Sequence, residues 1–281
     1  MLPILYGLLS AATWGAGDFS GGLAARKMGT YRAVFWGDLL GLLIILPIAL
    51  FLREPVPAAH AFLIASIGGM LGSVGLLVLY YSLSQGRMSI AAPVSALFAA
   101  VLPVVVGLFT QGLPTPNQFI GFAFALAAVW LISQGNPNEK FQLKHLSDLR
   151  LPVLAGLGFG FYFIFVHYAS KESASVIWTM VASRLAGTLM LLMVVLVRHD
   201  TFSVQRDAWA LVFLNGTLDL GGNLFFILAS QAGRLDVSSV LSSLFPGSTV
   251  LLAAIFLKER IFARQWLGIA AAFVAIVLFT I

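Results

Sequence analysis

Residues 84–98 read SQGRMSIAAPVSALF and residues 231–245 read QAGRLDVSSVLSSLF, and a shift of 147 positions lays one stretch over the other. Gly-Arg matches near the start of both stretches, and Ser-x-Leu-Phe matches at their ends. The register continues without a gap to Gln118 over Gln265. Apolar sequences share single Leu or Ala residues easily, but these matches involve glycine and polar residues. They predict that the chain consists of two related halves.

Two further matches lie nearer the start of each half. A shift of 145 lays Trp14 and its following glycine over Phe159 and its following glycine. A shift of 146 lays Asp38 over Arg184, with a glycine three residues later in both halves. The whole first half therefore has a counterpart in the second.

The composition indicates a protein dissolved in lipid. The 281 residues are 60% hydrophobic and only 10% charged, and the mean hydropathy is +0.98, whereas soluble domains are about 25% charged. The net charge is +5, but no basic run could track a phosphate backbone, so we expect no nucleic-acid partner. The chain has no cysteine, which excludes disulfides and Cys-ligated zinc. We expect no cofactor, no metal and, since MLPILYG lacks a basic start, no cleaved signal peptide.

Ten segments are apolar and long enough to cross a membrane, since a crossing helix needs about 20 residues. They lie at about 3–24, 31–52, 60–84, 89–110, 117–134, 152–170, 174–197, 207–230, 235–257 and 263–281. Each half then holds five spans. Because five is odd, the halves must insert with opposite orientations, as in many secondary transporters. We therefore expect an all-α membrane protein with two inverted five-helix repeats (1–134 and 152–281), a polar connection (135–151) and a central cavity.

Lys and Arg are distributed unevenly between the joints. Twelve fall in joints after odd-numbered spans and three (Arg53, Lys171 and Arg234) in joints after even-numbered spans, while Arg184 lies inside a span. By the positive-inside rule the odd joints are cytoplasmic. We expect both termini outside, in a multi-pass protein of the plasma membrane, here a bacterial inner membrane.

Three stretches carry a family resemblance: TWGAGDF (13–19), QGRMSIAAPVSALFAAVLP (85–103) and LKERIFARQWLGIAAAFVAIVL (257–278). On them the chain resembles the EamA-type, ten-span members of the drug/metabolite transporter superfamily. The likeness covers essentially the whole chain, although the first half lacks the Glu-Arg pair. It implies a cavity lined by spans one to four and six to nine, peripheral fifth and tenth spans, and transport of small metabolites, often amino acids. A homodimer through the peripheral helices is a further expectation.

Four ionisable side chains lie well inside the expected spans: Asp18, Asp38, Arg184 and Asp219. Each costs roughly 2.5–3.5 kcal/mol at mid-membrane on insertion scales, so each should face a cavity or a partner. Asp38 and Arg184 occupy equivalent positions of the two halves, and we expect them to form an ion pair or gate across the cavity. A purely structural bridge between the second and seventh spans is the alternative.

Trp14 and Asp18 are four residues apart and share one helix face, and their counterparts Phe159 and Phe163 share the matching face. This pattern predicts a substrate-binding wall that is largely aromatic and carries one carboxylate. For the two phenylalanines, plain packing is the alternative.

Asn215, Asp219 and Asn223 recur every four residues and form a polar stripe in the second half only. We interpret the stripe as substrate-binding; interhelical hydrogen bonding is the alternative for the two asparagines. Asp18 and Asp219 are candidates for proton coupling, because a carboxyl group without a cationic neighbour in a span could carry a proton. Arg184 could neutralise one of them, or clasp a substrate carboxylate with both nitrogens.

Prolines interrupt two matched spans: Pro93 and Pro103 in the fourth, and Pro246 in the ninth. A proline frees a backbone carbonyl one turn earlier, and interrupted helices mark binding sites in inverted-repeat transporters. The three prolines are therefore hinge candidates.

One rival class is an intramembrane aspartyl protease. Residues 15–18, GAGD, match its Gly-x-Gly-Asp motif, with Asp38 or Asp219 as the second acid beside Asp18, but its Pro-Ala-Leu segment is absent from the sequence. A channel would need a continuous polar lining, and an ATP-driven carrier would need a phosphate-binding loop. We therefore predict a non-enzymatic secondary transporter that moves small polar or amphipathic metabolites, with amino acids as the first guess, by alternating access. Proton coupling is a hypothesis.

Overall fold

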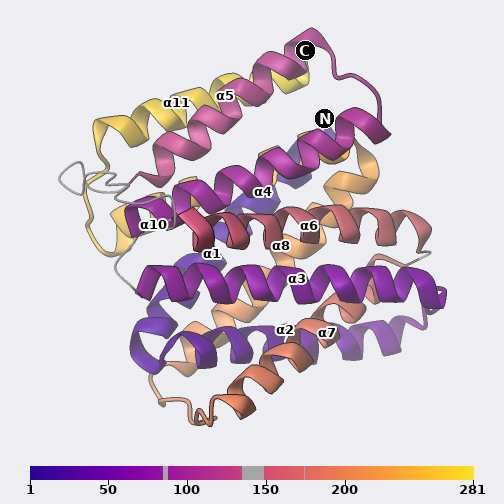
Figure 1. Cartoon of the computed structure of the whole chain (residues 1–281), viewed down its shortest axis with the longest axis vertical. Helices are drawn as coiled ribbons and strands as arrows, with labels where there is room; N and C mark the ends of the chain where they lie inside the picture. Colours follow the sequence, from indigo (N-terminus) through magenta and orange to yellow (C-terminus); the bar gives the residue numbers. More distant parts are fainter. Residues whose placement is uncertain (85–87, 135–148, 174) are drawn as a thin grey trace.

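The computed structural model describes residues 1–84, 88–134, 149–173 and 175–281, and within these ranges the chain forms eleven helices and no strand. The helices are α1 (Leu2–Met28), α2 (Thr30–Leu52), α3 (Ala59–Ser84), α4 (Met88–Thr110), α5 (Pro116–Ser133), α6 (Arg150–Glu172), α7 (Val176–Val197), α8 (Trp209–Ala232), α9 (Leu235–Ser242), α10 (Phe245–Phe256) and α11 (Ala263–Thr280). The predicted all-α class is confirmed (Figure 1).

The lengths and hydropathies of these helices fit a membrane protein. Eight segments are long and apolar enough to cross a membrane, with α9 and α10 counted as one segment, and the apolar segment Val94–Thr110 is shorter. α1 has 27 residues, but its small and polar residues, Asp18 among them, keep its hydropathy low. The chain is a multi-pass membrane protein, and the count of ten crossings stays a prediction.

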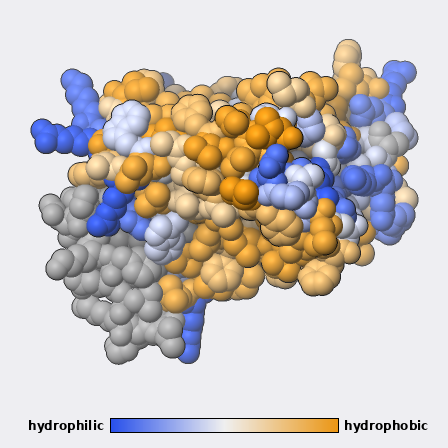
Figure 2. All heavy atoms as spheres, turned by 90° about the horizontal axis from the view of Figure 1, so that it is seen from above, coloured by the Kyte–Doolittle hydropathy of each residue, from blue (hydrophilic) through white to orange (hydrophobic). Residues whose placement is uncertain are grey.

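The surface is banded in the way a bilayer requires. Figure 2 shows apolar residues over the middle of the visible face and hydrophilic residues gathered at its two ends. Large apolar side chains such as Leu189, Phe213 and Phe273 are more than half exposed. Lipid tails cover such side chains at no hydrophobic cost, because the tails are as apolar as leucine.

Helix packing joins the two halves of the chain throughout. α1 packs along α8 and α6 along α3, while α2 packs on α7 and α5 on α11. In the sequence match α1 corresponds to α6, α3 to α8, α2 to α7 and α5 to α11. Each contact therefore joins one half to the other, and α5 and α11 lie together at one edge of the bundle (Figure 1).

Close approach of α1 and α8 depends on a glycine. A Cβ built on Gly222 would overlap the indole ring of Trp14. Nearby, Ser10 Oγ donates a hydrogen bond of 2.9 Å to the Gly222 carbonyl. This position therefore lets a large aromatic ring lie against the backbone of the neighbouring helix.

Successive joints lie at opposite ends of the bundle. The start of α1 lies beside the α8–α9 joint, since a Cβ on Gly233 would come 2.7 Å from Cβ of Pro3. The other end of α1 lies beside the α7–α8 joint, where Lys27 forms an ion pair with Asp207. The two chain ends lie at the same end of the bundle (Figure 1).

The segment expected as one span at 235–257 is two helices. α9 ends at Ser242 and α10 begins at Phe245, with Pro246 in the first turn of α10, where its missing N–H leaves no helical bond unmade. By contrast α4 continues unbroken past Pro103. The side chain of Pro93 lies outside the described residues. Hinge roles for the three prolines stay predictions.

Candidate functional site

A cavity of about 100 Å³ lies inside the bundle. Since roughly 10–15 Å³ on this measure is enough for one water molecule, the cavity has room for several waters. Within the described part of the chain no residue of α5 or α11 lines it. The lining residues are Trp14, Asp18, Asp38, Gly69, Gly72, Ser73, Leu76, Leu79, Ala99, Phe159, Tyr162, Phe163, Ser183, Arg184, Asp219, Asn223 and Phe245.

Arg184 of α7 holds two carboxylates at this cavity. Its Nη1 donates to Oδ1 of Asp38 on α2, and its Nη2 donates to Oδ2 of Asp219 on α8. The Arg184 and Asp38 side chains are 8% exposed, and the Asp219 side chain is 30% exposed. The structure thus forms the expected pair between equivalent positions and adds Asp219, which the sequence left open.

Two matched glycines lie against the ion pair. A Cβ on Gly41 would come 3.5 Å from Nε of Arg184, and a Cβ on Gly187 would come 3.1 Å from Oδ2 of Asp38. Each half therefore presents one charged residue and, three positions later, a glycine that faces the charged residue of the other half.

Hydrogen bonds extend this ion pair in both directions. Ser73 Oγ on α3 donates to Oδ2 of Asp38 over 2.9 Å. Asn223 Nδ2 donates to Oδ2 of Asp219 over 3.3 Å, and the Tyr162 hydroxyl of α6 donates to Oδ1 of Asn223. A polar chain therefore crosses the cavity from α3 to α6 through α2, α7 and α8.

Two residues of this polar chain of hydrogen bonds, Ser73 and Tyr162, were not predicted to belong to the site. Tyr162 lies three residues after Phe159. Residues three apart share a helix face, just as residues four apart do, and only the four-residue spacing was used in the prediction. The three-residue spacing could have identified Tyr162. No comparable periodic signal marks Ser73.

The aromatic residues of the predicted wall meet at the cavity. Trp14, Phe159 and Phe163 all line it. The Trp14 ring lies 5.5 Å from the ring of Phe163 at 27° and 5.9 Å from that of Phe226 at 29°. The ring of Tyr162 completes the cluster in an edge-on arrangement, with its centre 6.4 Å from the centre of the Trp14 ring. The cavity lining therefore includes an aromatic cluster that adjoins the polar chain at Tyr162.

Asp18 lies on the cavity wall and differs from the other carboxylates. Among the described residues nothing donates a hydrogen bond to it or forms an ion pair with it. The preceding residue, Gly17, packs on the backbone of Asp219, where a Cβ would come 3.3 Å from the Asp219 amide nitrogen. The neighbour of Asp18 on α8 is thus a second acidic residue.

The structure does not bring Asn215 to the cavity lining. Its Nδ2 donates to the Gly17 carbonyl over 2.9 Å and so ties α8 to α1. Asp219 and Asn223 of the same predicted stripe do line the cavity. Of the nine predicted binding residues, Asn215 alone lies outside the lining, and it makes the interhelical bond that was its alternative.

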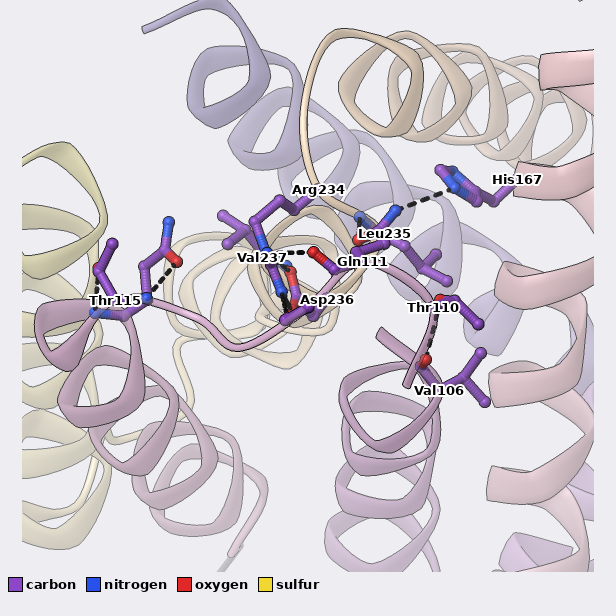
Figure 3. Close-up of polar contacts among 11 residues, drawn as sticks. Val106, Thr110, Gln111, Thr115, His167, Arg234, Leu235, Asp236 and Val237 are labelled. Atoms are coloured by element: carbon purple, nitrogen blue, oxygen red, sulfur yellow. Dashed lines mark hydrogen bonds and ion pairs between the residues drawn. The ribbon is translucent and has the colours of Figure 1, made fainter. Parts of the chain in front are cut away.

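A second polar cluster, which we name the clasp, ties the halves together near one end of the bundle (Figure 3). Arg234, at the start of α9, grips the carboxylate of Asp236 with Nε at 3.0 Å from Oδ1 and Nη2 at 2.7 Å from Oδ2. Its Nη1 donates to the Gln111 carbonyl over 3.1 Å, and its Nη2 to the Gly112 carbonyl over 2.8 Å. Arg234 thereby joins the α8–α9 joint to the α4–α5 joint.

Gln111 completes the clasp with its side chain. Its Oε1 accepts from the backbone N–H of Leu235 over 2.9 Å, and its Nε2 lies 3.3 Å from Nε2 of His167 on α6 (Figure 3). His167 is 1% exposed. The clasp was not predicted, because Gln111 and Arg234 lie in joints and Asp236 lies in the first turn of α9, so no helical periodicity links the three residues.

The proteins similar to this chain include the following three relatives and one solved structure. An uncharacterized protein of Methanocaldococcus jannaschii is 28% identical over 134 residues, which are 47% of this chain and 97% of that protein. A "Putative sugar uptake protein" of Lactiplantibacillus plantarum is 23% identical and covers 83% of this chain and 81% of its own. A protein of Streptococcus pyogenes serotype M1 with the same description is 23% identical, and the match covers 92% of this chain and 90% of that protein.

One solved protein crystal structure, 14% identical in sequence, superposes with a TM-score of 0.80 over 99% of this chain and 96% of its own, and so has the same fold. The model of the EamA-like transporter family matches residues 1–134 and 149–281. Members of this family are transporters and not enzymes, so the aspartyl-protease alternative was wrong. The chain belongs to the EamA-like transporter family.

Proposed function

We propose that this protein is a secondary active transporter that moves small polar or amphipathic metabolites across the plasma membrane by alternating access. One observation carries the proposal: a buried arginine holds carboxylates from two other helices at an internal cavity that both halves line. Charged groups inside a membrane are costly and mark substrate or ion pathways.

The proposed architecture is two inverted five-helix repeats, 1–134 and 152–281, joined by 135–151. The family match in two pieces, 1–134 and 149–281, supports this division. The relative from M. jannaschii, matched over 97% of its length by 134 residues, is about as long as one half. The packing of α1 on α8 and of α6 on α3 is the exchange that a two-fold axis in the membrane plane would produce.

Alternating access requires contacts between the halves that form at one end of the cavity and open in the cycle. The clasp supplies such a contact, because Gln111 and Gly112 come from the first half and Arg234 from the second. The α9–α10 break at Ser243 and Leu244 follows α9 directly, and a change of backbone angles there would let α9 move relative to α10. We propose that the Pro246 region is a hinge in this movement.

Several details belong to the same proposal. Asp18 and Asp219 are the proton-coupling candidates, with Arg184 and Asp38 as the charged groups that face Asp219. The membrane is a bacterial inner membrane, with both termini outside, and a homodimer would use α5 and α11. Amino acids are the first substrate guess from the sequence, and sugars are the second, since two relatives carry that description.

The test is counterflow into liposomes that contain the purified protein, with labelled amino acids, sugars and amines outside. Uptake of at least one class above that of empty liposomes supports the proposal, and a flat result across the panel contradicts it. A pH gradient across the same liposomes tests coupling. We expect the gradient to change flux, and Asp219→Asn to abolish the change; unchanged coupling in both Asp18→Asn and Asp219→Asn would remove protons from the mechanism.

A further inference from the structure

The cavity has few hydrogen-bond donors to offer a solute. Both terminal nitrogens of Arg184 already donate, one to Asp38 and one to Asp219. The arginine side chain is 8% exposed, and Gly41 faces its Nε side. A carboxylate on a solute would therefore compete with two ionised partners for this guanidinium.

The acidic residues outnumber the basic one. Asp18, Asp38 and Asp219 line the cavity, and Arg184 is the one cationic side chain among the lining residues that the structure describes. Carboxylates accept hydrogen bonds and, when ionised, donate none. Asp18 has no partner among those residues, so its acceptor capacity is free for a solute that donates.

The aromatic wall adjoins this free carboxylate. Trp14 precedes Asp18 by one helical turn on the same face, and Phe163 and Tyr162 lie within 6.4 Å of its ring centre. The faces of aromatic rings carry negative charge density and attract organic cations, most strongly when water is excluded. A carboxylate beside stacked rings thus offers both charge and apolar contact.

From these contacts we infer that the cavity binds solutes with a protonated amine on an apolar or aromatic body, and that Asp18 is the residue that receives the ammonium group. The inference rests on the proposed transport function and narrows its substrate class. A free amino acid fits less well than an amine, because its carboxylate would be repelled by Asp219 and Asp38 and would compete with both for Arg184. A neutral polyol would find acceptors but would bring no cation to stabilise the ionised form of Asp18.

The experiment uses the purified full chain in lipid nanodiscs and three probes of one shape: 2-phenylethylamine, 2-phenylethanol and 3-phenylpropanoate, with glucose as a fourth. Titration calorimetry at neutral pH measures each affinity. We expect the amine to bind about tenfold or more tightly than the alcohol, in the range of a desolvated ion pair with ring contacts. The carboxylate should bind more weakly than the alcohol.

Asp18→Asn keeps the shape of the wall and removes its charge, and we expect it to abolish the preference for the amine over the alcohol. Asp207→Asn is the matched control, because it removes the same group from an exposed position in the α7–α8 joint outside the lining, and it should keep the preference. Equal binding of amine and alcohol by the unchanged protein, tighter binding of glucose or 3-phenylpropanoate, or an amine preference that survives Asp18→Asn would overturn the inference. The liposome assay tests transport separately. If sugars show counterflow in liposomes but the amine does not bind in calorimetry, this inference is refuted and the transport function stands.

Discussion

Arg184 keeps its positive charge in any environment, because a guanidinium does not lose its proton in proteins. A carboxyl group can escape the cost of burial by taking up a proton, but this arginine cannot. Its position inside α7 is therefore tolerable only with ionised partners, and the structure provides two. The same residue consequently bears on folding and on the charge of the cavity.

Arg184→Gln should destabilise the protein strongly. It would leave Asp38, with a side chain 8% exposed, buried without a cation, and breaking a buried pair from one side costs about 3–5 kcal/mol. The measurement is the melting temperature of the purified protein in detergent. Asp219→Asn is the control: its side chain is 30% exposed and Arg184 keeps Asp38, so the loss should be clearly smaller. Equal losses would contradict the prediction that the burial of Asp38 makes the loss of Arg184 the more costly change.

Gly222→Ala should displace Trp14 and lower the melting temperature by several degrees. A Cβ at this position would overlap the indole ring, and overpacking typically costs about 1–3 kcal/mol. Gly221→Ala is the matched control on the same helix, since its Cβ would meet only Thr13 at 3.8 Å. The prediction fails if both alanine variants melt alike.

Part of the cavity could be predicted from single residues, and the reasons are physical. Asp38 and Arg184 could be paired because they are equivalent in the two halves and each is too costly to leave alone in lipid. The ion pair of Asp219 with Arg184 could not be predicted in this way. Asp219 has no charged counterpart in the first half, and whether its side chain reaches Arg184 depends on the rotation of α8. Asn215 shows the same limit: a four-residue spacing fixes its helix face but not whether that face meets a cavity or α1.

At the scale of elements, the α9–α10 break has a local cause. Pro246 cannot donate a backbone hydrogen bond, so the turn before it, at Ser243 and Leu244, is where the helix is easiest to interrupt. Yet Pro103 lies inside α4 without a break. A proline therefore predicts a weak point, and packing decides whether the helix bends there, stops or continues.

Arg234→Gln should open the clasp end of the bundle. The variant loses the donors to the Gln111 and Gly112 carbonyls, which hold α9 to the α4–α5 joint. Because the chain has no cysteine, a single Ser238→Cys in α9 is a clean reporter; Ser238 is fully buried. Reaction with a membrane-impermeant maleimide should rise several-fold when Arg234→Gln is added to the Ser238→Cys background.

A matched arginine controls for a general loosening of the fold. Arg198 lies at the end of α7, with its guanidinium 4.1 Å from the ring centre of Tyr31. Arg198→Gln should leave the labelling of the Ser238→Cys reporter unchanged. If both arginine variants raise labelling equally, the clasp does not close this end. If neither does, Arg234 stabilises its joint without guarding access.

At the scale of the whole molecule, the prediction is an odd number of spans, five, in each half. Two sequence-related units with five crossings each would insert in opposite directions, so equivalent side chains such as Asp38 and Arg184 would approach from opposite sides and meet. The contact between them, and the pairing of α5 with α11, agree with this reasoning. The sequence could not say how the two units are tilted, because that depends on the packing of every interface and not on one motif.

The orientation of the molecule in the membrane is the remaining whole-molecule prediction. Positive joints stay in the cytoplasm, so the α7–α8 joint, which holds Arg198 and Arg206, should be inside and both termini outside. Single cysteines that replace Leu2, Ile281 and Gln205, all exposed positions, can be labelled in cells with a membrane-impermeant maleimide.

We expect Leu2→Cys and Ile281→Cys to react in intact cells and Gln205→Cys to react only after the membrane is permeabilised. The reverse pattern would invert the molecule and would make the joint charges a poor guide for this chain. Labelling of Leu2→Cys and Ile281→Cys on opposite sides would mean an odd total of crossings. That result would break the equivalence of the two halves, and with it the reason that Asp38 and Arg184 lie at the same depth.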